Sequence, residues 1–103
     1  MKAAYYSTKG PARDVLIAGE LPDPVPQPGE VLVRIAYSGV NPSDVKSRSG
    51  GSNAAMEFPR VIPHSDGAGV IEAVGEGVSA QLVGRRVWTI NGQWKRHSVP
   101  PPN

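Results

Sequence analysis

The residues that could do chemistry fall in two short segments of this 103-residue chain. In the first, Asn41, Ser43 and Asp44 surround Pro42, and Lys46 follows two residues later. Asparagine is a good helix N-cap, proline suits the first helical position, and an early aspartate lies near the positive helix end. Capping is the plainest interpretation. The alternative is a binding edge, because helix N-termini present unpaired N–H groups to ligands.

The second segment is the polar run His64-Ser65-Asp66, just before a predicted strand. A serine–histidine–aspartate triad is not expected, because neighbouring residues on an extended chain point to opposite sides. A metal site is not expected either, because the chain has no cysteine and its other histidine, His97, lies far along the sequence.

Gly67-Ala68-Gly69 follows directly and invites comparison with a dinucleotide-binding loop. That loop needs a third glycine where Glu72 stands, and it follows a strand and opens a helix, whereas this pair precedes a strand. We therefore interpret these glycines as positions that another backbone segment approaches closely.

Composition narrows the class of protein. Eleven Lys and Arg against nine Asp and Glu give a net charge of +2, which does not indicate a nucleic-acid partner. No apolar stretch approaches the roughly 18–20 residues of a membrane span, and the first residues lack the apolar run of a signal peptide. We expect a cytoplasmic protein with no membrane partner.

Twelve Gly and eleven Pro punctuate short runs of β-branched residues, the pattern of an all-β domain. We expect strands over residues 2–6, 15–21, 31–38, 69–74 and 83–90. Alternation in the clearest strand predicts one shared face for Val31, Val33, Ile35 and Tyr37. A short helix over residues 42–48 should end at Gly50-Gly51.

The end of the chain carries a hairpin signal. Asn91-Gly92 is the strongest two-residue turn signal, so residues 93–97 should pair back on the preceding strand. Trp88 and Trp94 flank this turn, and we expect them to pack across the hairpin.

Read in order, these segments resemble the N-terminal, GroES-like domain of the medium-chain dehydrogenase/reductase superfamily. The resemblance is strongest to the zinc-independent quinone oxidoreductase branch and runs from Met1 to about Arg96. The motifs that carry it are Met1-Lys2-Ala3, Pro28-Gly29-Glu30-Val31-Leu32-Val33, Ser38-Gly39-Val40-Asn41-Pro42-Ser43-Asp44, Pro63-His64-Ser65-Asp66-Gly67-Ala68-Gly69-Val70-Ile71, Val74-Gly75-Glu76-Gly77-Val78 and Val83-Gly84-Arg85-Arg86-Val87.

The resemblance implies a hydride transfer without metal. The zinc-dependent branch has Cys where this chain has Asn41, and His-Glu where it has Ser65 and Asp66. By resemblance, NADPH reduces a quinone or an enone, Asn41 lies beside the nicotinamide and the substrate, and Asp44 orients this corner.

The same resemblance assigns Ser43, Lys46, Ser65 and Asp66 to the cleft around this catalytic pair. Three positions depart from the family pattern. Lys46 stands where tyrosine is frequent, His64 where glycine is usual, and Arg85 where aspartate is common. These departures leave the identity of the substrate undetermined by the sequence.

Family members are several times longer, with a Gly-rich dinucleotide-binding domain after this one. We expect residues 1–96 to form a mainly β, GroES-like irregular barrel with one or two short helices, incomplete and inactive by itself. Residues 97–103 differ from the usual continuation, and a shift of one nucleotide accounts for all seven, so we hypothesise a frameshifted tail.

A second hypothesis is a stand-alone GroES-like binding module of the co-chaperonin type. That function needs a mobile loop ending in an apolar tripeptide, for which Ala54-Ala55-Met56 is a weak match. In either case missing strands would leave sheet edges unpaired, so we expect a homodimer or larger assembly through edge-strand pairing.

Overall fold

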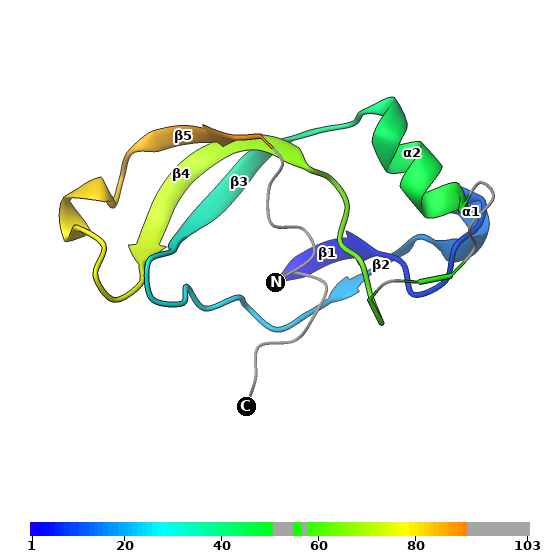
Figure 1. Cartoon of the computed structure of the whole chain (residues 1–103), viewed down its shortest axis with the longest axis horizontal. Coiled ribbons are helices and arrows are strands. Elements are labelled where there is room, and N and C mark those ends of the chain that lie inside the picture. The colour runs from blue at the N-terminus through cyan, green and yellow to red at the C-terminus, as the bar shows by residue number, and fades with distance from the viewer. Residues whose placement is uncertain (51–54, 57, 91–103) are drawn as a thin grey trace.

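The computed structural model describes residues 1–50, 55–56 and 58–90, and these form two small antiparallel sheets. Strands β1 (Lys2–Tyr5) and β2 (Ile17–Glu20) pair in the first sheet. Strands β3 (Val31–Gly39), β4 (Asp66–Val74) and β5 (Arg86–Thr89) form the second, in the order β3-β4-β5. The predicted mainly β class is confirmed. The sheets remain separate in this part of the chain and do not close into a barrel (Figure 1).

Three short helices complete the described fold. They are α1 (Ala12–Val15), α2 (Pro42–Ser49) and the 3-10 helix η1 (Ala80–Leu82). Helix α2 lies beside α1 at one end of the molecule, and strands β1 and β2 lie nearer its middle (Figure 1). Among the described residues, none of these helices is long and apolar enough to cross a membrane.

Two predicted strands begin later than expected. The strand predicted over residues 15–21 starts at Ile17, because helix α1 occupies residues 12–15 after Pro11, whose φ of −62° suits a helix start. The strand predicted over residues 83–90 starts at Arg86, because Gly84 has a φ of +93° and cannot continue a ladder. The predicted hairpin over residues 91–97 and Trp94 lie outside the described residues.

The predicted common face of Val31, Val33, Ile35 and Tyr37 is wrong. Register shifts between Leu32 and Val33, and again between Ile35 and Tyr37, break the alternation of β3. Ile35 pairs with Gly69 and Tyr37 pairs with Ala68, which are consecutive residues of β4. Because consecutive strand residues point to opposite faces, Ile35 and Tyr37 lie on opposite faces of the sheet.

The two strand glycines are confirmed as positions of close backbone approach. A Cβ atom at Gly69 would lie 1.9 Å from the main-chain oxygen of Arg34, and one at Gly67 would lie 3.0 Å from that of Tyr37. The core is small: the buried apolar residues of the described chain are Tyr6, Leu21, Val61 and Ile71. An isolated antiparallel bridge between Tyr6 and Val61 ties β1 to the segment before β4.

Candidate functional site

The first predicted segment forms the N-terminus of α2. Asn41 is the N-cap with an extended backbone, and Pro42 opens the helix. The main-chain N–H of Asn41 donates to Oδ2 of Asp44 at 2.7 Å, and the main-chain N–H of Asp44 donates back to the Asn41 carbonyl at 3.0 Å. The helix ends at Gly50, whose φ of 90° is left-handed. The capping interpretation of Asp44 is therefore confirmed.

A second hydrogen bond brings the two predicted segments together. The Asn41 side-chain amide donates to Oδ2 of Asp66 at 2.7 Å, so the start of α2 is linked to the start of β4. In the ladder, Asp66 faces Gly39, two residues before Asn41. Asn41, Asp44 and Asp66, three of the predicted site residues, thus form one half-buried cluster.

The other predicted cleft residues stand apart from this cluster. Ser43 and Lys46 are exposed on α2, and Ser65 is half-buried at the bend before β4. Within the described residues, no hydrogen bond joins the side chain of Ser43, Lys46 or Ser65 to Asn41 or Asp66.

Sequence reasoning missed a second link between the same two segments. His64 Nδ1 lies 2.8 Å from the Ser38 hydroxyl oxygen, on the strand that leads to Asn41. His64 pairs with Ser38 and not with its neighbours Ser65 or Asp66, as the argument against a local triad requires. The link could have been predicted from the pairing of Ser38 with Gly67, which brings Ser38 close to His64. That pairing depends on the register of β3, which the bulges make impossible to read from the sequence.

The other end of α2 is tied to the loop between β1 and α1. The Arg48 side chain donates to the Gly10 carbonyl at 2.6 Å, and the main-chain N–H of Gly10 donates to the Arg48 carbonyl at 2.9 Å. Burial raises the pKa of Tyr6. The positive charge of Arg48 lowers this pKa and the negative charge of Asp44 raises it. Sequence reasoning gave Arg48 no role beyond the helix end, yet it anchors the helix that carries Asn41.

The donor set does not fit zinc. Positions 41, 65 and 66 provide an amide, a hydroxyl and a carboxylate, whereas zinc sites are built mainly from cysteine and histidine. No group of three or more His, Cys, Asp or Glu residues in the described part of the chain could hold a metal ion. The Asn41 amide does fit a ligand that accepts a hydrogen bond, because only one of its two N–H groups is taken by Asp66.

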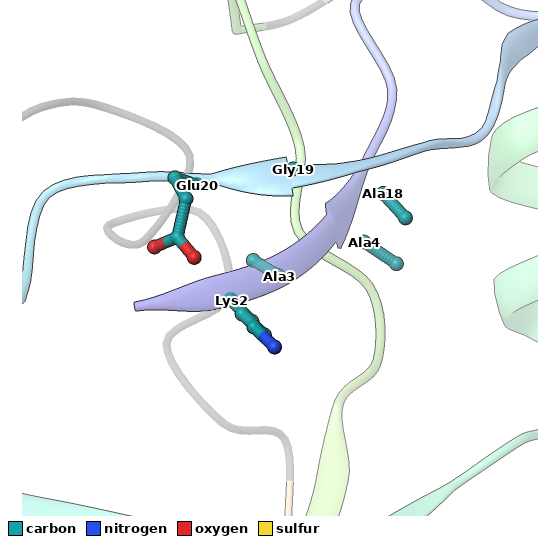
Figure 2. Close-up of a pocket in the computed structure, with 6 residues that line it drawn as sticks. All are labelled: Lys2, Ala3, Ala4, Ala18, Gly19 and Glu20. Atoms are coloured by element: carbon teal, nitrogen blue, oxygen red, sulfur yellow. The ribbon is translucent and has the colours of Figure 1, made fainter.

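A shallow pocket lies elsewhere, on the first sheet (Figure 2). It is lined by Lys2, Ala3, Ala4, Ala18, Gly19 and Glu20. Only Lys2 and Glu20 bring polar side chains to it, and none of the predicted site residues takes part.

The chain is similar in sequence to known proteins. Residues 27–99 match the protein family described as alcohol dehydrogenase GroES-like domain. The synaptic vesicle membrane protein VAT-1 homolog of Rattus norvegicus is 40% identical over 80 residues, which are 76% of this chain and 20% of that protein. The quinone oxidoreductase of Homo sapiens is 36% identical over 102 residues, which are 96% of this chain and 31% of that enzyme.

Solved structures share the fold. A putative NADPH:quinone reductase from Bacillus thuringiensis superposes with a TM-score of 0.77 at 30% identity, covering 99% of this chain and 33% of that one. A mycobacterial protein complexed with NADPH gives a TM-score of 0.75 at 33% identity, covering 88% of this chain and 28% of that one. The chain spans about a fifth to a third of the length of these relatives.

Proposed function

Because the chain belongs to the alcohol dehydrogenase GroES-like domain family, we propose that it is the catalytic domain of an NADPH-dependent quinone oxidoreductase. The quinone oxidoreductases among its relatives support the reaction class. The fold shared with a protein complexed with NADPH supports the cofactor. The substrate class is a quinone or a related enone.

The Asn41–Asp66 hydrogen bond is the observation that carries this proposal. Asp66 takes one amide N–H of Asn41 and leaves the other free to donate to a substrate carbonyl oxygen. A donor held in place before substrate arrives stabilises the charge that develops on that oxygen without reorganising. Bound NADPH supplies a hydride, and with one proton from solvent the quinone becomes a hydroquinone.

We propose that no zinc takes part, because the donors at positions 41, 65 and 66 are not those that zinc takes. Polarisation of the carbonyl then falls to hydrogen bonding from Asn41. Asp44 fixes the main chain of the same residue, so backbone and side chain are both held. Ser43, Lys46 and Ser65 would line the outer part of the cleft.

We further propose that the 103 residues alone do not turn over substrate, since they span about a third or less of the relatives. Strands β3 and β5 each pair on one side only among the described residues. Such edges favour association of copies by strand pairing. Sedimentation should therefore reveal dimers or larger species, whereas a monomer at all concentrations contradicts the pairing and a seven-membered ring favours a co-chaperonin-type module.

A chimera tests the enzymatic proposal. This chain replaces the matched stretch of the human quinone oxidoreductase, and oxidation of NADPH is followed with 1,4-naphthoquinone as acceptor. We expect quinone-dependent oxidation that survives a chelator and falls at least about 100-fold in Asn41→Ala, as when one oxyanion donor is removed. Ser47→Ala, an exposed residue of the same helix that is not assigned to the cleft, is the matched control. A folded chimera that binds NADPH but reduces no quinone overturns the proposal.

A further inference from the structure

The acceptor beside Asn41 decides which way its amide points. The Asn41 amide nitrogen lies 2.7 Å from Oδ2 of Asp66. A carboxylate has no hydrogen to donate, so only the NH2 group of the amide can face it, and the amide oxygen must point away. With Asp66 as the acceptor, one N–H and one oxygen of the Asn41 amide are presented in a single orientation.

Asp66 is itself held by the sheet. It is the first residue of β4 and faces Gly39 in the ladder with β3. A Cβ atom on Gly39 would lie 3.3 Å from the Cβ of Asp66, which is tighter than an ordinary contact, so the missing side chain gives Asp66 its room. The register of two strands, rather than a flexible loop, therefore places the carboxylate opposite Asn41.

The helix holds Asn41 by separate contacts. Asp44 accepts its main-chain N–H at 2.7 Å, and Arg48 ties the far end of α2 to Gly10. Neither of these contacts involves Asp66. Removal of Asp66 should therefore release the side-chain amide of Asn41 and leave the backbone of α2 in place.

We propose that Asp66 is a positioning residue, which fixes the Asn41 amide so that one N–H is presented to a ligand carbonyl oxygen. The identity of that ligand rests on the proposed function, but the orientation of the amide does not. Positioning in advance matters because an amide already oriented loses no rotational freedom when the ligand binds. In this cluster a direct hydrogen bond between Asn41 and Asp66 joins α2 to β4.

The test reads the amide directly by nuclear magnetic resonance on the 15N-labelled 103-residue chain. Asn41→Ala identifies the side-chain NH2 signal by its loss. In the parent chain we expect one of the two amide protons shifted downfield and a rigid-backbone value of the heteronuclear NOE. Asp66→Ala should abolish both, whereas Asp66→Asn, which keeps a neutral acceptor, should retain part of the shift.

Glu72→Gln is the matched control, because Glu72 is a carboxylate of the same strand that pairs with Arg34 at 2.9 Å. It should leave the Asn41 signal unchanged. Main-chain signals of residues 42–49 report on the helix. An Asn41 amide that stays rigid in Asp66→Ala overturns the proposal, as does a loss of the α2 signals together with the amide.

The isosteric Asp66→Asn variant keeps the test decisive where Asp66→Ala does not fold, because a completely unchanged amide signal in Asp66→Asn also overturns the proposal. Failure of the proposed function looks different. A chimera that reduces no quinone, combined with an amide that depends on Asp66, rejects the reductase and retains the positioning role.

Discussion

Tyr37 and Trp88 lie on the same face of the second sheet, one on each side of Ala68. Tyr37 pairs with Ala68 across β3 and β4, and Trp88 pairs with Ala68 across β4 and β5. Directly opposed residues of antiparallel strands point to the same side. The exposed fractions are 78% for Tyr37 and 80% for Trp88, so this face carries two of the most exposed large apolar side chains in the described chain.

Replacing Trp88 should make the chain more soluble without unfolding it. Trp88→Thr keeps a strand-favouring residue and removes an exposed aromatic surface, so stability should change by no more than about 0.5 kcal/mol. Light scattering against concentration should show weaker association.

Val87→Thr is the matched control for Trp88→Thr, because Val87 is the neighbouring half-buried residue that points to the opposite face. It should cost about 1 kcal/mol through partial burial of a hydroxyl and leave association unchanged. Equal association of Trp88→Thr and the parent chain would show that this face plays no part.

Loss of the Arg48 side chain should loosen α2. Arg48→Ala removes the charged hydrogen bond to the Gly10 carbonyl and should lower the free energy of unfolding by about 1.5–3 kcal/mol. Arg48 also lowers the pKa of Tyr6 against the effect of burial, so the variant should raise that pKa further. Urea denaturation and ultraviolet titration of the tyrosines measure the two effects. Lys46→Ala, on the same helix but exposed, should change neither.

A methyl group at Gly69 should prevent folding. The added Cβ would meet the main-chain oxygen of Arg34 at 1.9 Å, and the three nearest atoms all belong to the main chain of β3, which cannot move aside as a flexible side chain can. We expect Gly69→Ala to cost more than about 3 kcal/mol, as seen by circular dichroism during thermal unfolding. Gly77→Ala is the comparison, because its φ of +83° is strained but its surroundings are open, so it should cost only about 1–2 kcal/mol. Similar costs for the two variants would contradict the steric argument.

The amino group of Met1 and the carboxylate of Asp23 should give opposite pH dependences. Their ion pair, 2.8 Å between nitrogen and oxygen, raises the pKa of the Met1 amino group above 8.0 and lowers that of Asp23 below 3.8. The contribution of the Met1 amino group to the free energy of unfolding is present below pH 8.0 and is lost as the pH rises through the raised pKa. The Asp23 contribution is present above pH 3.8 and is lost as the pH falls through the lowered pKa.

The pair is exposed, so both changes should appear as small decreases in melting temperature, measured by scanning calorimetry in low salt. Asp23→Asn should remove the acidic change and reduce the alkaline one. If the variant melts like the parent chain at every pH, the ion pair contributes nothing to stability.

Several features follow from the sequence alone because their causes act within a few residues. Asn41, Pro42 and Gly50 predict where α2 begins and ends, since caps bond over three or four positions. Gly67 and Gly69 predict close backbone approach, since only a residue without Cβ tolerates it. The family resemblance predicts a common site for Asn41, Asp44 and Asp66, and hydrogen bonds join these three residues in the structure.

Only the tertiary structure determines the hydrogen-bond partners of Asn41 and Arg48. Asn41 and Asp66 are 25 positions apart, and Arg48 and Gly10 are 38 apart. Whether Asn41 meets Asp66 depends on the register of β3 against β4, and the register shift between Ile35 and Tyr37 makes these two residues face opposite ways. A strict two-residue alternation cannot reveal a bulge, because one extra residue reverses every side chain beyond it. The sequence thus named candidate residues, and the sheet determined which of their atoms meet.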